Sequence, residues 1–150
     1  MAVHFKIQIE AQPEAVFDYL SDMKRHTEWA NPKAKMTMEE VSGGAPALGS
    51  KYRSGGIFVG KPTTADIEVT RFDRPRVFAY RLAQHFEGKK DTHFEHTYTL
   101  APADGGTNVE KMTWSDGNPV VGFIAYPAIR GDAMTSLRNL KAKLESAPRG

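Results

Sequence analysis

The change in hydrophobic period at Asn118-Pro119 constrains the fold of this chain more than any other sequence feature. Before it, short segments such as residues 3–10 alternate apolar and polar residues. After it, apolar residues recur every three or four positions up to Ser146. The first pattern is typical of strands with one buried face, and the second of an amphipathic helix. Asn118 is a good N-cap and Pro119 a good first helical residue, so the sequence predicts a long C-terminal helix.

Turn residues divide the region before Asn118 into strands. Turns such as Arg74-Pro75 and Asp104-Gly105-Gly106 separate the alternating segments. The sequence predicts strands over residues 3–10, 34–42, 50–59, 64–72, 77–84, 92–100 and 108–115. A helix that opens at Pro13 and a second short helical turn that ends at Trp29 follow the first strand.

The order of these elements predicts an α+β fold. Short connections favour antiparallel pairing. A sheet of about seven strands with one apolar face needs a cover, and the last helix is the only element long enough. We therefore predict one domain over residues 1–150, in which a curved, mostly antiparallel sheet wraps around the C-terminal helix, with two short helices after the first strand. With 40% hydrophobic residues in a chain of 150, there is room for a core and an internal cavity.

A series of short motifs spans nearly the whole chain. They are residues 11–17 (AQPEAVF) with Leu20 and Asp22, Trp29, residues 48–52 (LGSKY), Gly106-Thr107, and residues 137–141 (LRNLK). Their order and spacing resemble the START-like superfamily, also called SRPBCC, and within it the polyketide cyclase/dehydratase family. The resemblance implies a helix-grip fold, in which the sheet and the long helix enclose an elongated apolar cavity. Members of the superfamily include lipid carriers, polyketide cyclases, quinone-binding and hormone-binding proteins. The resemblance therefore implies a kind of ligand, and no family-wide catalytic motif exists to transfer.

Composition and motifs argue against several other functions. The chain has no cysteine, which excludes disulfides and thiolate chemistry. A net charge of +2 and scattered basic residues predict no nucleic-acid partner. Residues 55–61 nearly form a phosphate-binding loop, but Pro62 stands where Ser or Thr would hold magnesium. His93 and His96 point to opposite faces of a strand, so we expect neither a metal site nor a cofactor.

The sequence also indicates where in the cell the protein is expected. The N-terminal region lacks the continuous apolar stretch of a signal peptide. The longest nearly apolar stretch, residues 120–129, is far shorter than the ~20 residues that span a bilayer. We therefore expect a cytoplasmic protein without membrane insertion. The oligomeric state stays open, and a homodimer is one of the possibilities.

Strand alternation turns several polar side chains toward the predicted interior. His96 shares a face with Phe94 and Leu100. Four residues should converge on one inner surface: Tyr80, His96, Tyr98 and Trp114. They are either core residues whose polar atoms bond to the backbone or the lining of a ligand cavity. For His96, a third possibility is direct work as an acid or base.

The predicted helix adds Phe123, Tyr126 and Arg130 to the candidate ligand contacts. An unkinked helix would place Arg130 on the apolar face, where an unpaired guanidinium is costly. It must then pair with an acid, reach solvent or contact an anionic ligand. Pro127 can rotate this stretch and remove the conflict.

Three functions fit these predictions. The first is a module that binds a small hydrophobic molecule, of the polyketide, lipid, sterol or quinone type, between the sheet and the helix. The second is a polyketide cyclase or dehydratase that holds a poly-keto chain in one geometry, while His96 or Tyr98 supplies a proton or stabilises an enolate. The third is a protein-interaction or regulatory module that buries residues 120–129 in a partner.

Overall fold

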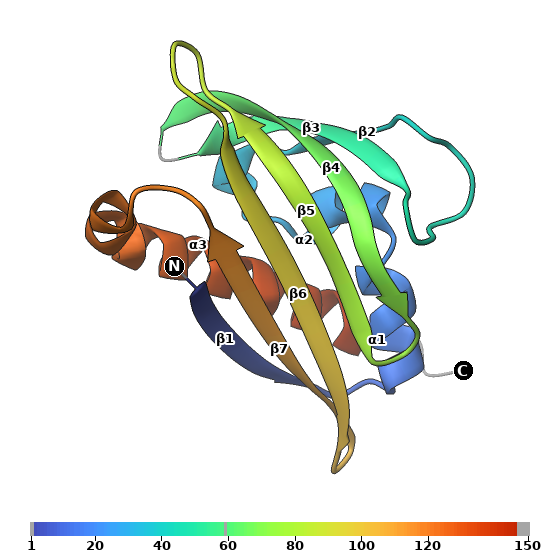
Figure 1. Cartoon of the computed structure of the whole chain (residues 1–150). Helices are drawn as coiled ribbons and strands as arrows, with labels where there is room; N and C mark the ends of the chain where they lie inside the picture. Colours follow the sequence, from blue (N-terminus) through green and yellow to red (C-terminus); the bar gives the residue numbers. More distant parts are fainter. Residues whose placement is uncertain (1, 59, 147–150) are drawn as a thin grey trace.

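The structure, a computed structural model, describes residues 2–58 and 60–146 (Figure 1). Its elements, with η marking a 3₁₀ helix, are β1 (Ala2–Ile9), α1 (Pro13–Leu20), η1 (Met23–Arg25), α2 (His26–Trp29), η2 (Pro32–Ala34), β2 (Thr37–Glu40), β3 (Lys51–Phe58), β4 (Lys61–Asp73), β5 (Val77–His85), β6 (Thr92–Ala103), β7 (Gly106–Ser115) and α3 (Pro119–Glu145). The described strands form one seven-stranded sheet in the order β1-β7-β6-β5-β4-β3-β2. Every neighbouring pair is antiparallel, which confirms the predicted helix-grip fold.

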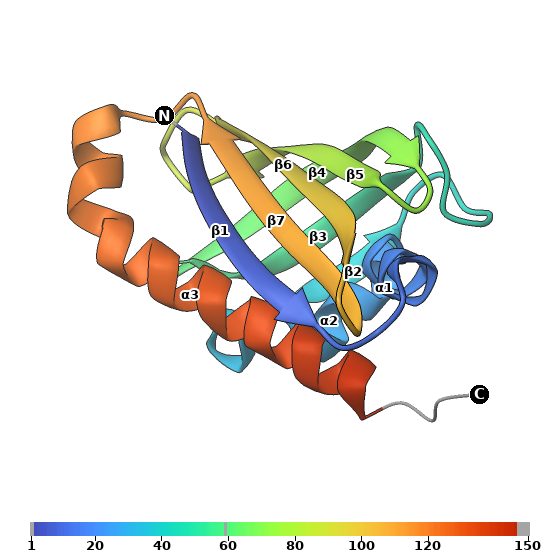
Figure 2. The ribbon, with the colours of Figure 1, turned by 90° about the horizontal axis from the view of Figure 1, so that it is seen from below.

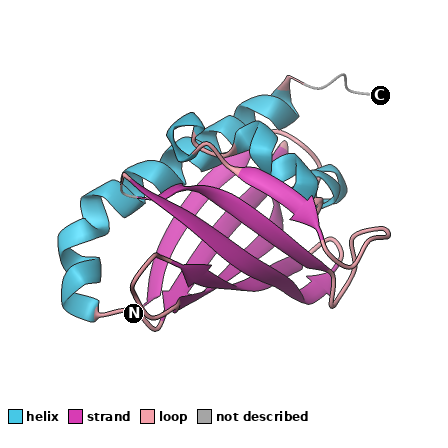
Figure 3. Cartoon of the chain, turned by 90° about the horizontal axis from the view of Figure 1, so that it is seen from above, coloured by secondary structure: helices cyan, strands magenta, loops and turns pink. Residues whose placement is uncertain are grey.

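The helices cover the concave face of the sheet. α3 crosses this face and contacts β1, α1 and α2 (Figures 2 and 3). The segment with α1 and α2 carries the chain from one edge strand, β1, to the other, β2. Asn118 caps α3 as predicted, because its side chain accepts a hydrogen bond from the Val120 N–H at 2.9 Å. The helix is continuous through Pro127, and its first turns run in a different direction from the rest (Figure 2).

The main core lies under the second half of α3. Leu137 and Leu140 are almost completely buried there, against Phe5, Ile9 and Val109 of the neighbouring core. The first turns of α3 instead project past the sheet (Figure 2). Their large apolar residues are exposed, so only part of the helix serves as the cover.

Several predicted strand boundaries differ from the structure. The strand expected over residues 34–42 shortens to β2, because Asn31 Oδ1 accepts from the Lys33 N–H at 3.1 Å and starts a 3₁₀ turn. Lys35 then adopts a left-handed conformation with φ of 46°, which an extended strand does not allow. β4 begins at Lys61, before the start predicted at residue 64. The predicted strand end at Val59 lies outside the described residues.

The Gly106-Thr107 motif begins β7 and packs against the chain segment that leaves β1. Thr107 is fully buried, and its Oγ1 donates to the carbonyl of Ala11 at 2.7 Å. Gly106 lies so close to the end of β1 that a Cβ there would collide with the carbonyl oxygen of Ile9. The motif therefore keeps the start of β7 against the chain that leaves β1.

Gly106→Ala should lower the free energy of unfolding by about 1–3 kcal/mol, as overpacking in a core does. The backbone of β1 must move to make room, because the atom in the way belongs to the main chain. Urea unfolding measures the effect. Gly131→Ala is the matched control, since a Cβ on this helical glycine meets nothing within 4 Å. That variant should be neutral or more stable. Equal stability of the two variants would contradict the packing argument.

Candidate functional site

A cavity of about 410 Å³ lies between the inner face of the sheet, α3 and the segment around α2 and η2. Much of its wall is apolar, with Ile67 and Leu82 from the sheet and Ile129 from α3. Its volume falls in the range of small-molecule sites. The curved sheet produces it, because the strands bend away from the helix beyond the packed core.

Polar residues of three adjacent strands meet on one side of this cavity. Strand register places Tyr80, His96 and Thr113 in one row across β5, β6 and β7. The next row contains Tyr98 and Lys111. The rings of Tyr80 and His96 lie 5.1 Å apart, and His96 Nδ1 is 2.9 Å from Thr113 Oγ1. All five residues line the cavity, so three predicted candidates do share one inner surface.

Two histidines of this region are neutral near neutral pH. His26 is buried and its Nε2 donates to the carbonyl of Leu20 at 2.7 Å. Burial lowers the pKa of His26 to about 4, and the Lys111 charge acts in the same direction. Burial, with a smaller contribution from Lys111, also lowers the pKa of His96 well below its usual value. Each ring can therefore offer one donor and one acceptor nitrogen.

The buried tyrosines are also uncharged. Burial raises the pKa of Tyr80 and of Tyr98 far above the ordinary phenol value. Tyr98 is completely buried, and the Lys111 Nζ lies 5.5 Å from the centre of its ring. Such a distance allows a cation–π contact. Lys111 is thus the cation inside a group of neutral donors and acceptors.

The predicted inward orientation of Trp114 is wrong. On β7 the inner positions are Val109, Lys111 and Thr113, whereas Trp114 pairs with the exposed Glu95 and is itself 43% exposed. Trp114 therefore lies on the outer face of the sheet. The apolar pair of Met112 and Trp114 suggested that their side of β7 faces inward. This was misleading, because the outer face near this edge also carries large side chains. The predicted inward orientation of His96 is confirmed, and its neighbour Glu95 points outward.

The helical candidates Phe123, Tyr126 and Arg130 do not line the cavity either. Phe123 is 79% exposed, Tyr126 is 36% exposed, and Arg130 is exposed as well. The helix presents Ala128, Ile129, Asp132, Ala133 and Ser136 to the cavity instead. Two causes account for the difference: the first turns extend beyond the sheet, and the inward face is rotated by about one residue from the predicted one. Arg130 thus reaches solvent, one of the outcomes expected for it.

Sequence patterns leave both faces of the strand open for Lys111 and give no signal for His26. Lys111 alternates with Val109 and Thr113, so an inner position for it follows once the burial of Val109 is known. His26 comes from a short helical turn without periodicity of its own. Its ring packs 4.6 Å from that of Trp29, which also lines the cavity. Only the tertiary fold brings this turn to the sheet.

The family described as polyketide cyclase/dehydrase and lipid transport matches residues 2–145. The chain belongs to this family. Among curated proteins, none matches the chain. The family assignment agrees with the resemblance seen in the short motifs.

Solved structures with the same fold align with almost the entire chain of this family member. Protein CV1439 from Chromobacterium violaceum has a TM-score of 0.72 at 19% identity, over 98% of this chain and 99% of that one. A protein from Rhodobacter sphaeroides has a TM-score of 0.76 at 19% identity, over 98% and 93% of the two chains. Ara h 8.0201 has a TM-score of 0.72 at 14% identity, over 98% and 99%. At these identities the likeness shows a common fold.

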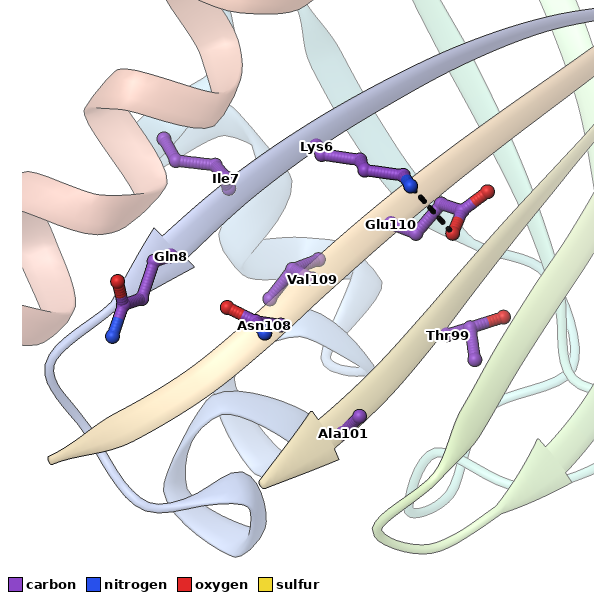
Figure 4. A pocket seen from close by; sticks show the side chains of 8 residues that line it. All are labelled: Lys6, Ile7, Gln8, Thr99, Ala101, Asn108, Val109 and Glu110. Carbon is purple, nitrogen blue, oxygen red and sulfur yellow. Dashed lines mark ion pairs between the residues drawn. The ribbon is translucent and has the colours of Figure 1, made fainter. Parts of the chain in front are cut away.

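A second hollow, of about 440 Å³, lies on the outer face of the sheet of this family member (Figure 4). Lys6, Gln8 and Asn108 border it and are exposed, and the Lys6 Nζ lies 3.9 Å from Glu110 Oε2. Its polar residues are solvated surface groups, unlike the buried and half-buried cluster on the inner face. The inner cavity is the better candidate, because buried groups with shifted pKa values concentrate at functional sites.

Within residues 2–58 and 60–146, no helix combines the length and the apolar character that crossing a membrane requires. The same residues contain no cluster of three or more His, Asp or Glu side chains able to hold a metal ion.

Proposed function

We propose that this member of the polyketide cyclase/dehydrase and lipid transport family binds a small hydrophobic molecule, of the polyketide, lipid, sterol or quinone type, in the inner cavity. The observation that carries the proposal is an apolar cavity whose interior polar groups gather on three neighbouring strands. A cavity of this kind can bury the apolar body of a ligand, while a few polar contacts fix the orientation of the ligand. The family description supports the same class of ligand.

A second candidate function is catalysis on a poly-keto chain, and His96 is the residue that favours it. Thr113 holds the ring through Nδ1, while Nε2 has no hydrogen-bond partner among the described residues. A neutral imidazole with one nitrogen fixed and the other free is suited to moving a proton. In this function, the cavity holds the poly-keto substrate and His96 moves a proton to or from it.

A neutral fluorescent dye tests the binding function. N-phenylnaphthylamine should bind saturably, with a rise in dye emission and a fall in the emission of Trp29, which is buried beside the cavity. The titration uses a Trp114→Phe background, because the exposed Trp114 would otherwise contribute a signal from the outer face. Ser54→Phe places a ring in the cavity and should weaken binding at least about tenfold, or ~1.4 kcal/mol.

Thr99→Phe is the matched control, since it adds the same ring to the outer hollow. The dye should bind this variant as it binds the parent. Loss of binding in Thr99→Phe with no loss in Ser54→Phe would assign the dye to the outer face. Absence of saturable binding to the parent protein would count against the proposal, and the interaction-module hypothesis would take its place.

A further inference from the structure

We infer that the ligand of this cavity is a monoanion, with its charge on an oxygen acid group such as a carboxylate, and that the Lys111 ammonium binds this group. The inference rests on the proposed binding function and specifies its ligand. The position of Lys111 is the first argument. It lies on the inner face of β7 between the buried Val109 and the cavity-lining Thr113, and it lines the cavity itself.

The second argument is that Lys111 lacks a counter-charge. Some cations elsewhere on the protein pair with carboxylates, as Lys24 does with Glu40 at 3.1 Å and Lys141 with Glu145 at 2.6 Å. Among the described residues, no carboxylate lies within ion-pair distance of the Lys111 Nζ. Lys111 is half-buried, so its ammonium loses part of its hydration without gaining a carboxylate partner, and the contact with the Tyr98 ring offsets only part of that cost.

The charges around the cavity leave one positive charge in excess. Lys33, Lys111 and Asp132 are its charged lining residues in the described chain. Lys33 and Asp132 are exposed and opposite in sign, so together they contribute no net charge. The two lining histidines, His26 and His96, are neutral as described above. The lining therefore carries a net charge of +1, complementary to a single anionic group.

Neutral donors near Lys111 complete a site for an oxygen acid. Thr113 lies two residues further along the same face of β7, and His96 lies opposite Thr113 on β6. Because one proton lies in the hydrogen bond between His96 Nδ1 and Thr113 Oγ1, either the Thr113 hydroxyl or the His96 Nε2–H can donate to an oxyanion that Lys111 attracts. Such a charge-assisted hydrogen bond is among the stronger ones in proteins. The apolar body of the ligand then extends over Ile67, Leu82 and Ile129.

Two dyes with the same rings test the inference. N-phenylnaphthylamine is neutral, and anilinonaphthalene sulfonate adds one anionic group to the same skeleton. Lys111→Met should weaken binding of the sulfonate about 10- to 100-fold and leave binding of the neutral dye unchanged, because only the charged hydrogen bond is lost. Lys111→Arg keeps the charge and should retain most of the affinity for the sulfonate.

Two further variants are controls for the position of the bound dye. Lys6→Met removes an exposed lysine that borders only the outer hollow, and it should change the sulfonate affinity less than about twofold. Phe123→Ser alters the exposed first turns of α3 and should leave it unchanged. Displacement of the sulfonate by dodecanoate would indicate an acyl chain as the ligand body, and displacement by naphthoate a fused ring. Either acid supports the inference if Lys111→Met weakens its binding.

Three results would overturn the inference: unchanged sulfonate affinity in Lys111→Met, an equal loss for both dyes, or loss of sulfonate binding in Phe123→Ser. An equal loss would mean that Lys111 supports the shape of the cavity. In each of these cases, binding of the neutral dye to the parent protein leaves the proposed function intact. Binding of neither dye to the parent would refute the inference and the proposed function together.

Discussion

A chain that ends at Asn118 should be unfolded or aggregated. The truncation removes α3, whose Leu137 and Leu140 are among the most completely buried side chains. It also exposes Phe5 and Ile9, which belong to the same core cluster. Cutting one buried leucine to alanine typically costs about 2–5 kcal/mol, against a total stability of about 5–15 kcal/mol. Loss of two leucines and of the core they cover therefore exceeds what the remaining sheet can sustain.

Circular dichroism and thermal melting measure this result. Point variants show whether the effect comes from the core or from the helix as a whole. Leu137→Ala should lower stability by about 2–5 kcal/mol. Phe123→Ser, on the exposed first turns of the same helix, should change it by less than about 0.5 kcal/mol. A cooperative melt of the truncated chain near that of the full chain would contradict the prediction.

The order of the elements could be predicted because its determinants are local. Asn118 caps α3 through its own side chain, and the alternation in β4 through Ala65, Ile67 and Val69 coincides with the residues that are buried. Such signals need only a few consecutive residues. The strand expected over residues 34–42 failed for a local reason too, since the Asn31 turn competes with extension.

The phase of an element is harder to predict than its type. Alternation in β7 allows two phases, and the large apolar side chains of Met112 and Trp114 suggest the one that the structure does not adopt. Hydrogen-bonded pairing with β1 and β6 determines the phase, and these strands are distant in sequence. On α3, the inward face depends on where the helix crosses the sheet, so Ile129 lines the cavity and Arg130 does not.

The site depends on tertiary structure more than the fold does. Tyr80, His96 and Tyr98 were predictable because adjacent hairpin strands bring them into register. His26 reaches the same cavity through a helical turn between the two edge strands, and no sequence period indicates it. Because His26 is buried in its neutral form, acid should destabilise the folded protein.

The free energy of unfolding should fall by about 3 kcal/mol as the pH drops from about 6.5 to about 4 because of His26 alone. In the unfolded chain this histidine has its ordinary pKa of 6.5, whereas burial lowers the pKa in the folded protein to about 4. Between these values the unfolded state binds the proton and the folded state does not. Protonation therefore favours unfolding, and stability is greatest above the unfolded pKa. His96, whose pKa is also lowered by burial, adds to the fall.

Urea unfolding of His26→Gln at several pH values isolates this contribution. Glutamine keeps an N–H near the carbonyl of Leu20 but does not titrate, so the variant should lose less stability on acidification than the parent protein. His85→Gln is the control of opposite sign. Hydrogen bonds that the ring of the surface His85 donates to Asp91 and Asp66 raise the pKa of this histidine, so its protonated form favours the folded state at low pH. Removing it should make the acid loss slightly larger. If His26→Gln and the parent lose stability equally between about pH 6.5 and 4, then His26 does not remain neutral in the folded protein, and the neutral surroundings inferred for Lys111 would have to be revised.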